Sequence, residues 1–336
     1  MASRKIRVGV VGVGKMGIHH ARILSRLPNA ELVGVADIHL WRGHIAAWRH
    51  RTLAFRNPQD LLSRVEAVVV ATPTPSHAEI GLQALERGIH CLIEKPLASN
   101  LEQAEKLVRR AEQKGVVLQV GHVERFNPAI LQAIPMVRQP RFIVVERLGP
   151  YDPRVNHISV VLDLMIHDLD ILLALVPAQV RDLEAVGACL LSEQEDIANA
   201  RIRFDSGCVA DVTASRISLE KSRKIRIFQE DSYLSIDYLN ASLKICRKKS
   251  SQVKSLKDIS VEYIHLPKSE PLQAQLEHFL HCIEHRQEPL VSGESGMKAL
   301  NMGLEVLQRL QRYSPGGNGN TSPSGWRERL EEKLST

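Results

Sequence analysis

The chain has 336 residues, of which 44% are hydrophobic and 24% charged, and its mean hydropathy is −0.14. These values are typical of a globular protein of about two domains, and they exclude a collagen-like, low-complexity or disordered chain. No apolar run reaches the ~20 residues of a membrane helix, and residues 1–7 lead directly into a strand-like segment without the apolar core of a signal peptide. We therefore expect a cytoplasmic protein with no membrane partner.

Cysteine and charge exclude further classes of protein. The five cysteines include no CxxC pair, which predicts free thiols rather than a disulfide framework. The net charge is +6, and residues 220–258 carry ten Lys or Arg against five Asp or Glu. This basic segment is either the solvated face of a sheet or a surface that attracts an anionic substrate. No nucleic-acid-binding motif accompanies it, so no nucleic-acid partner is expected.

Strand-like and helix-like segments alternate through the first 122 residues. Continuous apolar runs predict buried strands at 6–11, 31–37, 66–71, 89–93 and 116–121. Helical patterns lie between them, near 16–27, 40–50, 76–87 and 100–114. This alternation predicts an α/β fold, a Rossmann domain with a doubly wound parallel sheet over residues 1–122.

The pattern changes after residue 122. A strongly apolar helical stretch at 160–175 precedes strand-like runs with no helix between them, at 197–204, 208–215, 223–230 and 232–238. Such a succession predicts a mainly antiparallel open sheet covered by helices, an α+β domain over residues 123–313. Two more helices are expected near 271–286 and 294–312, and the Gly/Ser/Pro-rich start of residues 314–336 predicts a flexible tail.

A glycine pattern lies where the first predicted strand meets the first helix. Gly12, Gly14 and Gly17 form GxGxxG, which predicts a tight turn that lets backbone approach a pyrophosphate at the helix N-terminus. Asp37 ends the second strand 20 residues later, where a carboxylate can bind the adenosine ribose hydroxyls and repel a 2′-phosphate. These residues predict NAD as the cofactor, although Arg42 follows closely enough to reach a 2′-phosphate. The expected cofactor contacts include Lys15 and Met16, between the glycines.

Two further loops follow predicted strands at the same edge of the sheet. Thr72 and Pro73 begin a turn that ends at His77, and Glu94 and Lys95 end the next strand. Because ligands of open α/β sheets bind at the carboxyl ends of the strands, we expect all five residues to border the cofactor. His77 can equally be a helix-capping residue, and Lys95 can equally form a surface ion pair.

Asp163 and His167 lie four residues apart on the apolar helix predicted at 160–175. They therefore share one helix face and must be hydrogen-bonded or face a cleft, because unsatisfied burial costs about 1–3 kcal/mol for each group. A structural Asp–His pair is one interpretation. The other is acid–base catalysis, since an imidazole can accept the proton of an alcohol as a hydride leaves.

Together these motifs resemble the Gfo/Idh/MocA oxidoreductase family, through GVGKMG at 12–17, ATPTPSH at 71–77, EKP at 94–96 and the spacing of Asp163 and His167. The resemblance covers about residues 5–312. It implies a second domain whose open sheet face serves substrate binding and assembly into a homodimer or homotetramer. By position it implies that Lys95 contacts substrate and nicotinamide, that His167 is the acid–base group and that Asp163 is its companion.

Within the family, the segments at 121–129, 160–175 and 269–296 resemble the branch of UDP-N-acetylglucosamine 3-dehydrogenases. The resemblance implies NAD-dependent oxidation of the sugar C3 hydroxyl, with the ketone passed to a pyridoxal-phosphate aminotransferase of lipid A biosynthesis. Arg125, Arg147 and Arg154 can serve a UDP diphosphate. The substrate contacts that we expect are Lys95, His122, Glu124, Arg125, Asn127, Arg154, Asp163 and His167.

Two alternatives remain open at this point. One is another sugar or inositol dehydrogenase of the same family, such as a UDP-N-acetylglucosaminuronate dehydrogenase. The other is a non-catalytic NAD-binding regulator, although such a protein has no need for Lys95, Asp163 and His167 together. No metal is expected, because the histidines at 278, 281 and 285 lack accompanying ligands and fit a solvated helix face.

Overall fold

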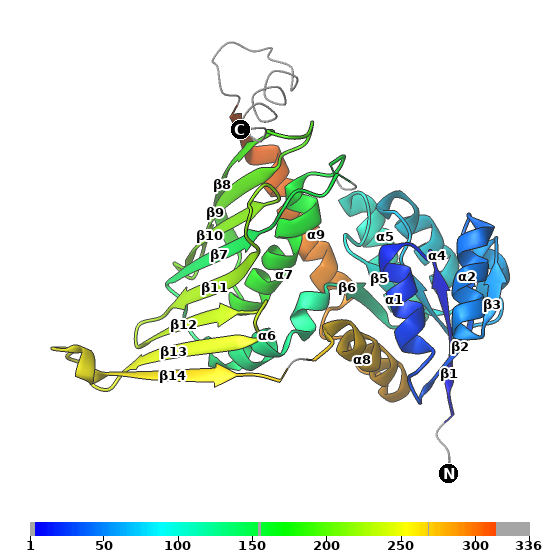
Figure 1. The fold of residues 1–336 in the computed structure, drawn as a ribbon, viewed down its shortest axis with the longest axis horizontal. Helices are drawn as coiled ribbons and strands as arrows, with labels where there is room; N and C mark the ends of the chain where they lie inside the picture. Colours follow the sequence, from blue (N-terminus) through cyan, green and yellow to red (C-terminus); the bar gives the residue numbers. More distant parts are fainter. Residues whose placement is uncertain (1–3, 154–155, 268, 314–336) are drawn as a thin grey trace, which may run out of the picture. The chain divides into compact units, whose positions relative to one another are not determined.

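The computed structural model describes residues 4–153, 156–267 and 269–313 (Figure 1). Within these ranges the chain forms two compact units. Unit 1 comprises the residues up to Phe126 together with Ser269–Leu300, and unit 2 comprises the residues from Asn127 to 267 and from Asn301 onward. The predicted tail at 314–336 lies outside the described residues.

Unit 1 is built on a six-stranded parallel sheet in the order β3-β2-β1-β4-β5-β6. Its strands are β1 (Ile6–Val11), β2 (Ala30–Ala36), β3 (Leu53–Phe55), β4 (Ala67–Val70), β5 (His90–Glu94) and β6 (Leu118–Gly121). The inner strands are apolar on both faces; all four residues of β4 are buried. This is the pattern of a parallel sheet covered on both sides, so the predicted Rossmann domain is confirmed.

Helices cover both faces of this sheet. They are α1 (Lys15–Leu24), α2 (Leu40–His50), α3 (Pro58–Leu62), α4 (His77–Glu86) and α5 (Leu101–Lys114), with short 3-10 turns η1 (Thr74–Ser76) and η2 (Val123–Phe126). Helix α1 contacts α2, whereas α4 contacts α3 and α5. Helix α5 shows how local sequence sets the ends: Asn100 accepts a hydrogen bond from the Gln103 N–H at its start, and Gly115 ends it at a φ of 62°.

A late segment of the chain also belongs to unit 1. Helix α8 (Pro271–His285) and the first part of α9 (Gly293–Arg309) lie in it. Leu276 and Phe279 of α8 are fully buried in the same core cluster as Val8 of β1 and Ala21 of α1. The sequence had placed this segment in the second domain, because an amphipathic pattern predicts a buried face without identifying the core that receives it.

Unit 2 is built on a nine-stranded sheet in the order β14-β13-β12-β11-β7-β10-β9-β8-β15. Its strands are β7 (Phe142–Leu148), β8 (Val180–Ala188), β9 (Ile197–Phe204), β10 (Val209–Ser215), β11 (Ser222–Phe228), β12 (Ser232–Asp237), β13 (Ser242–Lys248), β14 (Ile259–His265) and β15 (Leu310–Tyr313). Only the β7·β10 and β8·β15 pairs are parallel among the pairings of these described strands. The expected mainly antiparallel sheet is thus confirmed.

One face of this second sheet is covered by helices (Figure 1). The covering elements are α6 (Pro128–Ala133), the short turn η3 (Ile134–Met136), the π-helical turn η5 (Val161–Met165), α7 (Ile166–Leu175) and the second part of α9. Met165 and Leu169 are fully buried against Ile143 and Val145, which project from the same face of β7. The continuous helix predicted at 160–175 is therefore a π-helical turn followed by an α-helix.

Among the helices that the structure describes, none combines the length and the apolar character needed to span a bilayer.

Candidate active site

A cavity of about 640 Å³ opens in unit 1 at the carboxyl ends of β1, β2, β4 and β5. This is the edge at which open parallel sheets bind ligands. Most residues predicted to bind the cofactor line it: Gly12, Gly14, Met16, Asp37, Thr72, Pro73, Glu94 and Lys95. Ile38, His39 and Arg42, which were not predicted as cofactor contacts, also line it.

The glycine loop is shaped for a close backbone approach. Gly12 has a φ of +85°, and a Cβ there would lie 2.7 Å from the carbonyl oxygen of Ala71. A Cβ at position 17 would lie 1.8 Å from the carbonyl oxygen of Gly12. Helix α1 can therefore pack against the glycine loop only because residue 17 is a glycine. Gly14 is different, because no atom lies within 4 Å of a Cβ built on it and it faces the cavity. Helix α1 has no side-chain cap and no acidic residue in its first turn, so this end fits a diphosphate.

Asp37 ties the glycine loop to the turn that follows β2. Its Oδ2 accepts a hydrogen bond from the Val13 N–H at 2.9 Å, and its Oδ1 accepts one from the His39 N–H at 2.8 Å. The side chain is largely buried, with 9% of the residue exposed, and it borders the cavity. A carboxylate held in this way can accept further hydrogen bonds from ribose hydroxyls and repels a phosphate at the same place.

Three predicted cofactor residues do not line the cavity: Gly17, which packs against the glycine loop, and Lys15 and His77. Lys15 is exposed and does not line the cavity. His77 is 1% exposed, and its Nδ1 and Nε2 lie 2.9 Å and 2.8 Å from the carbonyl oxygens of Pro96 and Thr72. Burial lowers the pKa of His77 even though both carbonyls favour its charged form. His77 therefore joins the two loops instead of lining the cavity, a role that depends on Pro96, 19 residues further along the chain.

Glu94 has a buried partner that the sequence analysis missed. Its Oε1 lies 2.7 Å from the Nε2 of His20, a fully buried residue of α1. His20 lies three residues after Gly17, on the same buried face of α1. This spacing is the sequence signal from which the burial of His20 could have been predicted. This contact fixes Glu94 at the cavity wall beside Lys95.

The segment after β6 contributes three further predicted residues to unit 1. His122 is fully buried, and burial together with the charges of Lys95 and Arg125 lowers its pKa to about 3. It is therefore neutral at ordinary pH. Glu124 and Arg125 are also mostly buried, and the Arg125 Nη2 donates to the carbonyl oxygen of Leu290 at 3.3 Å.

Asn127 begins α6 in unit 2. Its Oδ1 accepts a hydrogen bond from the Ala129 N–H at 3.0 Å, and its Nδ2 donates to the Tyr238 carbonyl oxygen at 2.9 Å. Both contacts are structural, so Asn127 acts as a helix cap that is also bound to the sheet. The predicted substrate residue Arg154 lies outside the described residues.

The predicted acid–base pair lies in unit 2. Asp163 belongs to the π-helical turn η5, where its N–H donates to the Ser159 carbonyl oxygen at 3.0 Å, and His167 lies in the first turn of α7. Both residues are partly exposed within a helical segment that is mostly buried. Single π-helical turns inside helices are frequent at functional sites. Lys95 belongs to unit 1, whereas Asp163 and His167 belong to unit 2.

A buried ion pair adjoins His167 along the chain. The Nε and Nη2 of Arg147 donate to the two carboxylate oxygens of Asp168 at 2.6 Å and 3.0 Å. The Tyr238 hydroxyl lies between them, 3.0 Å from the Arg147 Nη2 and 2.5 Å from Asp168 Oδ1. Arg147 was considered for phosphate binding, but its side chain is only 4% exposed and it anchors α7 to β7 and the end of β12.

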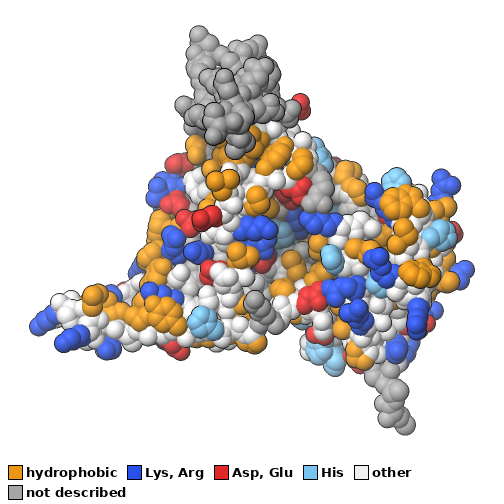
Figure 2. Space-filling view, viewed as in Figure 1, with side chains coloured by type: hydrophobic (Ala, Val, Ile, Leu, Met, Phe, Trp, Pro, Cys, Tyr) orange, Lys and Arg blue, Asp and Glu red, His pale blue; other side chains and the backbone are white. Residues whose placement is uncertain are grey.

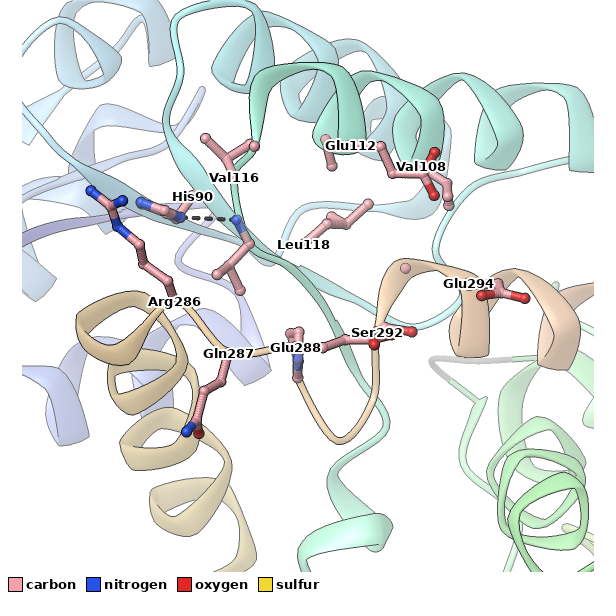
Figure 3. Close-up of a pocket in the computed structure, with 15 residues that line it drawn as sticks. His90, Val108, Glu112, Val116, Leu118, Arg286, Gln287, Glu288, Ser292 and Glu294 are labelled. Carbon is pink, nitrogen blue, oxygen red and sulfur yellow. Dashed lines mark hydrogen bonds between the residues drawn. The ribbon is translucent and has the colours of Figure 1, made fainter.

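A second cavity of about 540 Å³ in unit 1 opens at the opposite edge of the parallel sheet (Figure 3). It lies at the amino ends of β5 and β6, where His90 accepts a hydrogen bond from the Val117 N–H at 2.9 Å. Arg286 extends toward His90, and Glu112, Glu288 and Glu294 also line the cavity. This edge is not where parallel sheets bind dinucleotides.

Helix α8 carries three histidines at helical spacing, His278, His281 and His285. His278 Nε2 accepts a hydrogen bond from the Leu290 N–H at 2.9 Å, so one of the three already has a structural role. Among the described residues, no group of three or more His, Cys, Asp or Glu side chains is arranged to hold a metal ion.

Comparison with known proteins gives the class that this fold and cavity define. Residues 6–122 match the Gfo/Idh/MocA oxidoreductase family with its NAD-binding Rossmann fold, and residues 148–235 match the C-terminal domain of the same family. The chain belongs to the Gfo/Idh/MocA oxidoreductases, and its cofactor is NAD.

Particular relatives can also be named. The chain is 37% identical over 313 residues to the UDP-N-acetylglucosamine 3-dehydrogenase of Acidithiobacillus ferrooxidans, which covers 92% of this chain and 98% of that protein. A solved structure of that enzyme matches with a TM-score of 0.87 over 91% of this chain and 97% of its own, at 36% identity. The scyllo-inositol 2-dehydrogenase of Bacillus subtilis is 26% identical over 93% of this chain and 96% of its own.

Proposed function

We propose that this protein oxidises the C3 hydroxyl of UDP-N-acetylglucosamine to a ketone with NAD as the acceptor. The observation that carries the proposal is the 37% identity to a UDP-N-acetylglucosamine 3-dehydrogenase along nearly the whole of both chains. The identity to the inositol dehydrogenase is 26% over a similar span, which favours the nucleotide sugar as substrate.

NAD, when bound, accepts the hydride that leaves the carbon atom of the alcohol. In the proposed reaction a ring nitrogen of His167 accepts the hydroxyl proton, so that the hydride and the proton leave together and a carbonyl forms. The ammonium group of Lys95 donates a hydrogen bond to the same oxygen atom and stabilises the negative charge that develops on it. Asp163 orients the imidazole, one helical turn away on the same segment.

The cavity walls support NAD as the dinucleotide over NADP. Asp37 is held by two backbone N–H groups, so its carboxylate cannot easily turn away from a 2′-phosphate. Arg42 also borders the cavity, and its guanidinium carbon lies 5.1 Å from the centre of the Trp41 ring. Contact with an aromatic ring leaves Arg42 less available to a phosphate than an unstacked arginine.

The proposal also covers the fate of the ketone product. A 3-keto sugar is the substrate type of a pyridoxal-phosphate aminotransferase, so we expect the product to be aminated by such an enzyme on the way to a 2,3-diamino sugar of lipid A. We expect this to occur in the cytoplasm, in a homo-oligomer. We also propose that the UDP-sugar is contacted by four residues predicted from the sequence: His122, Glu124, Arg125 and Arg154.

A panel of substrates tests the function. Purified protein with NAD is incubated with UDP-N-acetylglucosamine, UDP-glucose, UDP-N-acetylglucosaminuronate or scyllo-inositol, and NADH is followed at 340 nm. A pyridoxal-phosphate aminotransferase and glutamate remove the ketone, since oxidation of an alcohol by NAD is unfavourable at equilibrium. NADH formation with UDP-N-acetylglucosamine alone supports the proposal. Turnover of inositol or the uronate in its place contradicts it, and NAD binding without turnover favours a regulator.

A further inference from the structure

Helix α2 carries large apolar side chains on its solvent-facing side. Trp41 is 61% exposed, Ile45 is 45% exposed and Trp48 is 83% exposed. Ile38, just before the helix, is 76% exposed. Ile38 lines the cofactor cavity, but Trp41, Ile45 and Trp48 do not. Most monomeric proteins do not gather such large apolar side chains at one place on the surface.

The spacing puts the three helical residues on one stripe. Positions 41, 45 and 48 are related by four and three residues, so they lie above one another on one helix face. The opposite face of α2 consists of Gly43, Ala46 and Ala47, which are buried. The packing of α2 onto unit 1 thus uses small residues, while its largest side chains face outward.

The charge around this stripe has one sign. Residues 38–56 contain four arginines and three histidines and no Asp or Glu. Arg42 and Arg49 are exposed and follow the two tryptophans directly. Figure 2 shows hydrophobic side chains mixed with Lys, Arg and His at the part of unit 1 that carries α2.

We propose that the outward face of α2 binds the surface of an anionic lipid bilayer. A helix that lies in the membrane interface has this composition: tryptophan and aliphatic side chains on one stripe, arginines at its borders, and no acidic residue to oppose the lipid charge. Each arginine near such a surface contributes to attraction, and tryptophan prefers the headgroup level. The charge of the segment is complementary to anionic lipid headgroups.

This inference is independent of the proposed substrate. It modifies the expectation of no membrane partner, which rested on the absence of a spanning segment, because a helix that lies on the surface does not have to cross the bilayer. The inferred association is peripheral and reversible.

Vesicle binding by the full-length protein tests the inference. Co-sedimentation is measured with vesicles of phosphatidylcholine alone and of phosphatidylcholine with phosphatidylglycerol, and binding is expected only to the second. The double variant that combines Ile45→Ser with Trp48→Ser should lower the partition coefficient between vesicles and water about tenfold or more. It removes two of the side chains that enter the membrane interface. Neither residue borders the cofactor cavity, so NAD binding serves as the control for folding.

Charge-matched variants locate the contact. Arg49→Glu should weaken binding at least about fivefold, as expected for the loss of one interfacial cation. Lys254→Glu makes the same charge change in the basic turn between β13 and β14 of unit 2 and should leave binding unchanged. If Lys254→Glu abolishes binding and Arg49→Glu does not, the contact lies on that turn and the inference is wrong.

Tryptophan fluorescence gives a direct readout of insertion. In a Trp326→Phe background, vesicles that contain brominated acyl chains should quench Trp41 and Trp48. Absence of quenching, or equal binding of the Ile45→Ser and Trp48→Ser variant, overturns the inference. Sedimentation equilibrium compares the oligomeric state of the native protein with that of the double variant. If the variant changes the oligomeric state and the native protein does not bind vesicles, this face of α2 contacts a second copy of the chain. That result also overturns the inference.

Discussion

The carboxylate of Asp37 accepts a hydrogen bond from the backbone N–H of Val13 at 2.9 Å, which fixes the end of β2 against the glycine loop. The same carboxylate borders the cavity at the carboxyl edge of the parallel sheet. One residue therefore shapes the loop that receives the diphosphate and determines which ribose can lie beside it.

Replacement of Asp37 should change the choice between NAD and NADP. Asp37→Asn keeps the size of the side chain and an oxygen acceptor but removes the negative charge. Because a hydrogen bond to a charged group is worth about 1.5–3 kcal/mol, the ratio of NAD to NADP affinity should fall about tenfold or more. Isothermal titration with both dinucleotides measures this ratio. The control variant Asp60→Asn changes an exposed carboxylate of α3 and should leave the affinity ratio unaltered. An unaltered ratio in Asp37→Asn would argue against a contact between Asp37 and the adenosine ribose.

The proposed proton transfer predicts large losses of turnover in two variants. Lys95→Met and His167→Asn should each lower kcat about 100-fold or more, since a positioned acid–base group supplies at least that factor. Initial rates of NADH formation at saturating substrate measure the loss. His157→Asn, an exposed histidine of unit 2, is the control. Wild-type kcat in either test variant, with normal NAD binding, would exclude that residue from catalysis.

The buried pair of Arg147 and Asp168 should matter for folding. Asp168→Ala removes the carboxylate that accepts two hydrogen bonds from the buried Arg147, so it should lower the free energy of unfolding by about 3–5 kcal/mol. Urea denaturation measures the change. The exposed pair of Arg203 and Asp182, 2.9 Å apart, gives the matched comparison: Asp182→Ala should cost less than about 1 kcal/mol. Equal losses in the two variants would show that the Arg147 pair is not a specific anchor.

Acid should destabilise the protein through His122. Its folded-state pKa of about 3 lies below the ordinary value of 6.5, so the unfolded chain takes up this proton first as the pH falls. One such group costs about 1.4 kcal/mol between pH 7.5 and pH 5.5. Urea unfolding at both pH values should show this loss in the native protein and a correspondingly smaller one in His122→Gln. Burial also lowers the pKa of His77, so the contribution of His77 to the loss of stability should persist in His122→Gln. An identical pH dependence of stability in the two proteins would contradict the lowered pKa of His122.

Local patterns were sufficient for much of the fold. The strand predicted at 197–204 has these bounds in the structure, and the one predicted at 232–238 ends one residue earlier. Their alternating residues face a core and solvent in turn, which is a property of the strand alone. By contrast, β3 and α3 were not predicted. A three-residue strand carries too short a pattern, and it forms because β2 offers an edge to pair with.

The site shows the same division between local and long-range information. The glycine loop and Asp37 could be placed at the cavity because their positions relative to two strands determine where they lie. The surroundings of His77 and Arg147 could not, since their partners Pro96 and Asp168 are 19 and 21 residues away and reach them only through tertiary packing. The π-helical turn around Asp163 also lacks a local sequence signal, because apolar spacing does not distinguish it from the α-helix that follows.

Deuterium transfer from C3 of the sugar to the nicotinamide tests the proposed reaction. UDP-N-acetylglucosamine that carries deuterium at C3 is oxidised by the protein with NAD, and the reduced nicotinamide is analysed by mass spectrometry. If C3 is the carbon oxidised, the reduced cofactor gains one mass unit and the initial rate falls when hydride transfer limits turnover. Unlabelled NADH from this substrate, with label transferred instead from C4 or C6 of the corresponding isotopomers, would contradict the proposed reaction.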